Sequence, residues 1–235
     1  MIYLITGATG DIGSRVVECL LVCGDGPRIL VRDAEKARAR YAQQNVGTGA
    51  WHARGESAIR ASGIAFTFVQ PAGFMSNAIG WATSIKAEGV VRAPTGDGRI
   101  AFIHPDDIAA VATKALTTQE YEGESLPITG PEALTYAEMT AKIGAAIGKP
   151  LRFQPISDEQ ERHQMIESGA PPEVVAAHVS IYRAIREGRL ATVTDNVNRV
   201  VGRQAAAFDR WAQENAAACD ATSCDALVDI ATAAD

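Results

Sequence analysis

Thr6-Gly7-Ala8-Thr9-Gly10-Asp11-Ile12-Gly13 is the stretch of sequence that decides the fold of this chain. It follows an apolar run over 2–6 that predicts a buried strand, and it opens a predicted amphipathic helix over 11–21. Gly7 permits the tight turn, Gly10 leaves space for a pyrophosphate beside the backbone, and Gly13 lets helix and strand pack closely. The first N–H groups of the helix then face the phosphates. Because a second strand follows the helix, the stretch favours dinucleotide binding over a turn that serves packing alone.

The end of the predicted second strand, over 28–31, indicates which dinucleotide binds. An acid there would bind the adenosine ribose hydroxyls and repel a 2′-phosphate. This chain has Arg32, which can pair with a phosphate, and Lys36 in a predicted helix over 33–43. Asp33 lies where NAD needs an acid, but it is also the expected N-cap of that helix. We favour NADP over NAD, the alternative being that both cations are simply solvated. The predicted cofactor-binding residues are Gly7, Thr9, Gly10, Asp11, Ile12, Gly13, Arg32 and Lys36.

The composition excludes several classes of protein. The chain has 235 residues, 47% hydrophobic and 21% charged, which suits one large domain or one with a small appendage. Its net charge of −6 argues against a nucleic-acid partner. No apolar run approaches the roughly 18 residues of a membrane span. The start of the chain lacks the basic region of a signal peptide, so we expect a cytoplasmic protein with a small-molecule partner.

The rest of the chain alternates between strand and helix patterns. Further strands are expected over 66–69, 90–92, 100–103, 125–128 and 151–155. Further helices are expected over 52–61, 78–87, 105–116, 136–147, 158–167, 172–186 and 198–217. This order predicts an α/β fold with a parallel sheet and right-handed crossovers.

Six segments together resemble the NmrA-like group of atypical short-chain dehydrogenase/reductases. They are 7–13, 31–37, 51–56, 68–77, 102–109 and 134–138, and Val201-Gly202-Arg203 with Phe208 also matches. The resemblance implies a doubly wound Rossmann-type parallel sheet with a small C-terminal α/β substrate lobe, and binding of NAD(P). We expect the Rossmann domain over 1–130, the lobe over 131–220 and a loose tail over 221–235.

The chain departs from the family pattern in three places. The segment between Tyr41 and Trp51 is short, which leaves open a natural short form or a missing stretch. No tyrosine is followed by lysine four residues later, so the usual phenol and lysine that serve proton transfer are not present as a pair. Gln70 stands where the family commonly has an arginine before the proline, so a charge that would orient a substrate is replaced by an amide.

The remaining polar residues offer a few candidates. His52, with Glu56 one turn later, is the candidate general acid; the alternative is a surface pair that stabilises the helix. Asn77 and Phe74 are candidate substrate-binding residues, with a helix N-cap and a core position as their alternatives. His104 precedes two aspartates, which is more typical of a helix cap than of a metal site, so we predict no metal. The cysteines are interpreted as buried or unreactive thiols: Cys19, Cys23, Cys219 and Cys224.

These observations predict an NADPH-dependent reductase that transfers hydride to a carbonyl or conjugated double bond of a small, apolar organic molecule. The alternative is a non-catalytic NAD(P) sensor of the NmrA type, which the missing tyrosine–lysine pair favours. A homodimer and a regulatory protein partner both stay open.

Overall fold

The computed structural model describes residues 4–6, 12, 15, 16, 19, 28–30 and 56–220. Within them, β1 (Leu4–Thr6) and β2 (Arg28–Leu30) form a parallel pair in which Leu4 lies opposite Arg28. Residues 12, 15, 16 and 19, between these strands in sequence, are helical. The predicted strand–helix–strand order is therefore confirmed where it is described. The predicted helix over 33–43 and the start of the one over 52–61 lie outside the described residues.

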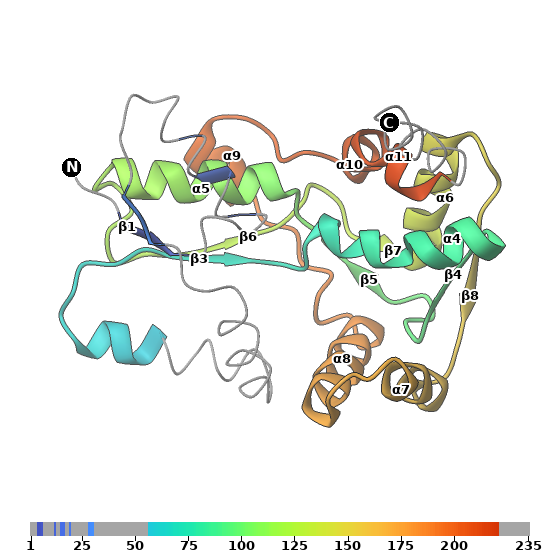
Figure 1. Cartoon of the computed structure of the whole chain (residues 1–235). Coiled ribbons are helices and arrows are strands. Elements are labelled where there is room, and N and C mark those ends of the chain that lie inside the picture. The colour runs from blue at the N-terminus through green and yellow to red at the C-terminus, as the bar shows by residue number, and fades with distance from the viewer. Residues whose placement is uncertain are drawn as a thin grey trace, which may run out of the picture.

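A second pair of parallel strands is formed by residues that follow the first unit in the sequence. β3 (Phe68–Pro71) runs parallel to β6 (Ser125–Ile128), and α5 (Pro105–Thr117) packs against this pair (Figure 1). α9 (Asn196–Val201) lies beside α5. Their apolar side chains form one core cluster: Ile103, Ile108, Val111, Tyr121, Leu126, Ile128, Val197 and Val200.

The other end of the molecule has a core of its own, at the right of Figure 1. β4 (Val90–Ala93) pairs in parallel with β8 (Arg152–Pro155), and β5 (Arg99–Ile100) pairs antiparallel with β7 (Leu134–Thr135). The helices of this half are α4 (Ala82–Glu88), α6 (Tyr136–Ile147), α7 (Asp158–Glu167), α8 (Pro172–Arg186), α10 (Phe208–Glu214) and α11 (Ala216–Cys219). Met139, Ile143, Ile185 and Phe208 are fully buried there.

Local capping explains why the central helix predictions are confirmed. Thr135 and Glu138 form a reciprocal capping box at the start of α6, and Ser157 and Gln160 form another at the start of α7. At α5 the fixed backbone angle of Pro105 suits the first helical position. Such signals lie within one helical turn, so the sequence alone reveals them.

The single helix predicted over 198–217 is wrong. α9 ends at Gly202, which adopts a left-handed conformation with φ of 75°, and helical structure resumes only at Phe208. The buried carboxylate of Asp107 accepts a hydrogen bond from the backbone N–H of Ala206 at 2.7 Å. Because that N–H donates to a distant side chain, it does not donate to a preceding helical turn.

Smaller corrections concern three other predicted elements. The strand predicted over 66–69 forms two residues later, as β3. The strand predicted over 100–103 is reduced to β5 and an isolated bridge between Phe74 and Ile103. The helix predicted over 78–87 begins earlier, as the 3₁₀ helix η1 (Met75–Trp81), before continuing as α4.

Across the part of the chain that the structure describes, no helix is both long and apolar enough to cross a membrane.

Candidate functional site

The loop after β3 is held in place by backbone hydrogen bonds to β6 and to Ile103, the residue that forms an isolated bridge with Phe74. The N–H of Ala72 donates to Ile128, and the N–H of Ile103 donates to Gly73, each at 2.9 Å. The N–H of Met75 in turn donates to the carbonyl of Ile103. A Cβ at Gly73 would overlap the ring of Phe102. The loop therefore lies at the carboxyl end of the parallel β3–β6 pair, which is where open α/β sheets bind ligands.

The two predicted substrate-binding residues lie on this loop but differ in exposure. Phe74 is half-buried and packs against the core beside α5 and β6. Asn77 is exposed and lies in η1. The alternative that Asn77 caps a helix is wrong, because η1 begins at Met75 with Phe74 in the cap position. Asn77 is thus accessible on the loop, and its contact with a substrate stays a prediction.

Most of the predicted cofactor-binding residues lie outside the described part of the chain. Ile12 is described: it is helical, half-buried, and packs against the same core as Phe74. The structure does not describe Gly7, Thr9, Gly10, Asp11, Gly13, Arg32, Lys36 or the candidate acid His52. Their roles stay predictions.

Glu56, the expected partner of His52, contacts the end of β3. The side-chain Nε2 of Gln70 lies 2.8 Å from Oε1 and 2.9 Å from Oε2 of Glu56. Residues 56–61 are helical, which confirms the second half of the predicted 52–61 helix. The amide of Gln70 therefore joins that helix to the carboxyl end of β3.

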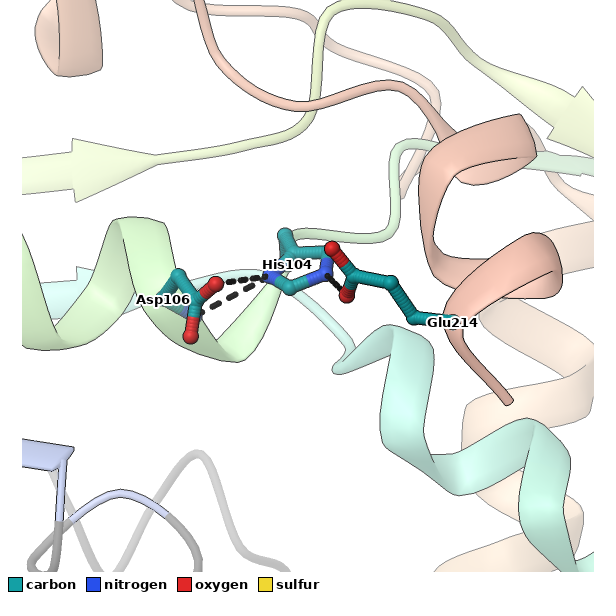
Figure 2. A group of neighbouring side chains, drawn as sticks. All are labelled: His104, Asp106 and Glu214. Atoms are coloured by element: carbon teal, nitrogen blue, oxygen red, sulfur yellow. Dashed lines mark hydrogen bonds and ion pairs between the residues drawn. The ribbon is translucent and has the colours of Figure 1, made fainter.

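His104 is the N-cap of α5, which confirms its predicted capping role. It is 1% exposed, and its Nδ1 accepts a hydrogen bond from the backbone N–H of Asp106 at 3.1 Å. Because Nδ1 is an acceptor, the neutral ring carries its proton on Nε2, which lies 3.0 Å from Oε2 of Glu214 (Figure 2). The buried imidazole is thus satisfied on both sides and links α5 to α10.

The two aspartates that follow His104 contact different parts of the chain. Asp106 pairs with Arg15 through Oδ1 and with Arg210 through Oδ2. Asp107 has no exposed surface and accepts hydrogen bonds from Arg203 and from the Ala206 backbone. Both carboxylates also lie at the positive end of α5. The first turn of α5 therefore contacts two segments that are far from it in the sequence, the helix that carries Arg15 and residues 203–210.

The ligand atoms of His104, Asp106 and Glu214 lie within 4.8 Å of one another, as in a metal site. However, Arg210 pairs with both acids, at 2.9 Å to Asp106 and 2.6 Å to Glu214. Partial burial acts to raise the pKa of Glu214, but hydrogen bonds from Arg210 and His104 outweigh it and lower that pKa. Since arginines already neutralise both carboxylates, we assign the cluster to ion pairing rather than to a metal.

An aromatic cluster lies behind η1. The centroid of the Tyr136 ring lies 4.9 Å from that of Trp81. It lies 6.3 Å from the ring centroids of Phe102, Phe153 and Tyr182. Burial raises the pKa of Tyr136 far above its usual range, so the phenol stays neutral. Burial likewise raises the pKa of Glu161, which lies beside Tyr182. The sequence did not single out Glu161, because its surroundings come from α8 and not from its own helix.

A cavity of about 570 Å³ opens at the ends of β4 and β8, beside the start of α7. None of the described residues that the sequence predicts as site residues lines this cavity. Its lining combines apolar and charged side chains: Pro94, Gly96, Pro155, Ile156, Ser157, Asp158, Glu159, Arg162 and Arg186. Arg186 and Asp158 pair with each other there at 2.8 Å, which leaves little net charge to recruit an ion.

Two curated proteins share substantial sequence with this chain. It is 40% identical over 163 residues to a (4-alkanoyl-5-oxo-2,5-dihydrofuran-3-yl)methyl phosphate reductase of Streptomyces griseus, a match covering 69% of this chain and 57% of the relative. It is 39% identical over 173 residues to the NAD(P)H azoreductase of Xenophilus azovorans, covering 74% and 60%. The chain thus spans less than two thirds of either relative. No family model matches it.

Solved structures give the fold. The NADPH-bound quinone oxidoreductase of Escherichia coli superposes with a TM-score of 0.78 at 18% identity, covering 91% of this chain and 99% of that one. The Citrobacter triphenylmethane reductase complexed with NADP(H) gives 0.73 at 18% identity, covering 92% and 99%. These similarities agree with the predicted resemblance to the NmrA-like group of atypical short-chain dehydrogenase/reductases. The predicted Rossmann-type α/β fold is confirmed.

Two of the three departures from the NmrA-like pattern now have a described setting. Gln70 stands at the position where the family commonly has an arginine. Its neutral side-chain amide donates a hydrogen bond to the carboxylate of Glu56. Tyr136, in the matching 134–138 segment, is enclosed by aromatic rings and lies in the core rather than on the loop. The short segment between Tyr41 and Trp51 lies outside the described residues.

Proposed function

We propose that this chain is an NADPH-dependent reductase that transfers hydride to a carbonyl or conjugated double bond of a small, apolar organic molecule. The observation that carries the proposal is its 40% and 39% identity to two proteins that are named reductases. The position of the loop with Phe74 and Asn77, at the carboxyl end of β3, supports a site for a small molecule.

The β1–helix–β2 unit fits a dinucleotide. β1 and β2 are parallel, and helical structure is present at residue 12, near the end of the glycine-rich stretch. Backbone N–H groups over 7–13 would bind the pyrophosphate. Arg32 and Lys36 would bind the 2′-phosphate that distinguishes NADP from NAD. Two solved structures with this fold contain NADP(H) or NADPH, which agrees with that choice.

The bound NADPH would supply the hydride. The chain itself would bind the cofactor and the substrate, orient them and provide a proton. Phe74 would contact the apolar substrate and Asn77 would donate to its carbonyl. His52 would supply the proton, with Glu56 one turn later favouring its charged form. The proposed division is a Rossmann domain over 1–130 and a small substrate lobe over 131–220 that is intertwined with it, since β4 pairs with β8 and α9 packs against α5.

The test is oxidation of NADPH by the purified chain with a panel of quinones, enones and ketones. Gly10→Val is the matched control, because a branched side chain would occupy the space of the pyrophosphate. We expect substrate-dependent oxidation by the parent and none by the variant, with unchanged far-UV circular dichroism. Equal rates for both proteins would contradict dinucleotide binding at this stretch.

The missing tyrosine–lysine pair favours a second candidate, a non-catalytic NAD(P) sensor. A sensor would bind cofactor without turning over any member of the panel. Tight binding of both NADP⁺ and NADPH, with no oxidation, would therefore support regulation of a protein partner and overturn the reductase.

A further inference from the structure

Asp106 connects two segments that are remote in sequence. Its Oδ1 pairs with Arg15, a residue of the helix that follows the glycine-rich stretch. Its Oδ2 accepts from Arg210 of α10 at 2.9 Å. The side chains are partly exposed, with 38% for Arg15, 31% for Asp106 and 49% for Arg210. One carboxylate thus links the proposed dinucleotide-binding helix to the C-terminal part of the chain.

Arg210 is itself held by a network that reaches a buried group. Its Nε lies 2.6 Å from Oε1 of Glu214, and Oε2 of Glu214 lies 3.0 Å from Nε2 of His104. Figure 2 shows His104 between Asp106 and Glu214. Because His104 is buried and caps α5, it anchors the network to a rigid element. A network anchored in this way restricts its members more than an isolated surface pair does.

The orientation of the first helix matters for phosphate binding. Its N–H groups must lie within about 3 Å of the phosphate oxygens to donate well. On the core side the helix is fixed by packing: Val16 is buried, and Ile12 packs against the α5 core. Arg15 adds a charged tether to the first turn of α5. Loss of this ion pair would remove one restraint on the rotation of the helix.

We infer that Asp106 and Arg210 are positioning residues for dinucleotide binding, and that the binding site and α10 are thereby coupled. The inference rests on the proposed function. Arg210 acts through Asp106 and Arg15 and need not touch the ligand. Since coupling between two sites is reciprocal, dinucleotide binding also stabilises α10 against opening.

The experiment measures the dissociation constant of NADPH for the full chain by fluorescence titration. The variants are Arg210→Ala, Arg210→Lys, Arg15→Ala, Asp106→Asn and the double variant Arg15→Ala/Arg210→Ala. Arg189→Ala is the matched control, since Arg189 pairs with Glu187 on an exposed surface outside the network. Melting temperatures show that each variant is folded.

We expect Arg210→Ala to weaken NADPH binding by about threefold to tenfold, the size of a modest allosteric coupling. Arg210→Lys should recover part of the loss, Arg189→Ala should bind as the parent does, and the double variant should lose no more than Arg15→Ala alone. Hydrogen exchange supplies a second readout. NADPH should slow exchange over Phe208–Glu214 in the parent and not in Asp106→Asn.

The outcomes separate the two proposals. If the parent does not bind NADPH, both the proposed function and the coupling are overturned. If the parent binds and folded Arg210→Ala binds within twofold of it, the coupling alone is overturned. A lower melting temperature for Arg210→Ala with an unchanged dissociation constant would assign the network to stability only.

Discussion

Arg203 donates from its guanidinium to Oδ1 of Asp107 at 2.6 Å, and that aspartate has no exposed surface. The second oxygen of Asp107 accepts from the Ala206 backbone, so one buried carboxylate fixes the non-helical stretch between α9 and α10. Asp107 also lies in the first turn of α5, where the helix dipole favours a negative charge. The turn that divides the C-terminal helices is therefore set by this long-range pair.

Replacing Arg203 by alanine should lower the free energy of unfolding by about 1–3 kcal/mol, because the buried carboxylate loses its charged partner. Part of the penalty is reduced by water, since the arginine side chain is 43% exposed. Urea denaturation measures the change. Arg189→Ala removes an exposed pair and should cost less than about 1 kcal/mol. Equal losses for the two variants would contradict a special role for Asp107.

Gly130→Ala should destabilise the protein, because a Cβ there would overlap the carbonyl oxygen of Phe102. Backbone cannot move aside as a flexible side chain can, so we expect a loss of about 1–3 kcal/mol. Gly80→Ala is the control, as a Cβ at Gly80 meets nothing within 4 Å. Thermal unfolding of both variants measures the difference. A Gly130→Ala variant as stable as the parent would show that the packing around Phe102 relaxes freely.

Glu161→Gln should stabilise the protein increasingly as pH rises. Burial raises the pKa of Glu161 above its ordinary value of 4.5, so its protonated form is favoured in the fold. That contribution is complete below the ordinary pKa and is lost as pH rises through the raised folded pKa. Glutamine does not titrate, so the variant avoids this loss. The melting temperature of the parent should fall below that of the variant as pH rises above the ordinary pKa of 4.5.

Glu159→Gln removes the same charge from an exposed position on the same helix and controls for net charge. If the Glu161→Gln and parent curves run parallel from acid to neutral pH, burial of that carboxyl does not affect stability.

Arg32→Ala should weaken NADPH binding far more than NADH binding, because only NADPH carries the 2′-phosphate. A charge-assisted hydrogen bond contributes roughly 1.5–3 kcal/mol, which is about tenfold to a hundredfold in affinity. Titration with each cofactor gives the ratio. Equal losses for the two cofactors would mean that Arg32 acts on the adenine or on the fold.

His52→Ala should lower kcat by at least about a hundredfold, the lower end of general acid catalysis, with little change in NADPH affinity. The pH profile of the parent should fall as His52 loses its proton, and the variant should lose that limb. Gln70→Ala is a companion variant, because Gln70 holds Glu56 one turn from His52. Full activity of His52→Ala would contradict its role as the general acid and would mean that the proton comes from solvent or substrate.

The sequence by itself determined the features that depend on near neighbours. The glycine spacing after 2–6 indicated the parallel β1–β2 unit, and helices α6, α7 and α8 begin and end where the patterning places them. Capping pairs such as Thr135 with Glu138 act within one turn. His104 was also recognisable as a cap, since Pro105 and two aspartates follow it.

Only the tertiary structure decided what the first turn of α5 contacts. Asp106 and Asp107 look alike in the sequence, yet one lies between two arginines and the other is buried against residues 203–206. No periodicity within a helix or strand reports partners that are some hundred residues away. The break at Gly202 has the same origin. Local pattern favoured one long helix, and a buried carboxylate that needed donors overrode it, because leaving a buried charge unpaired costs more than ending a helix.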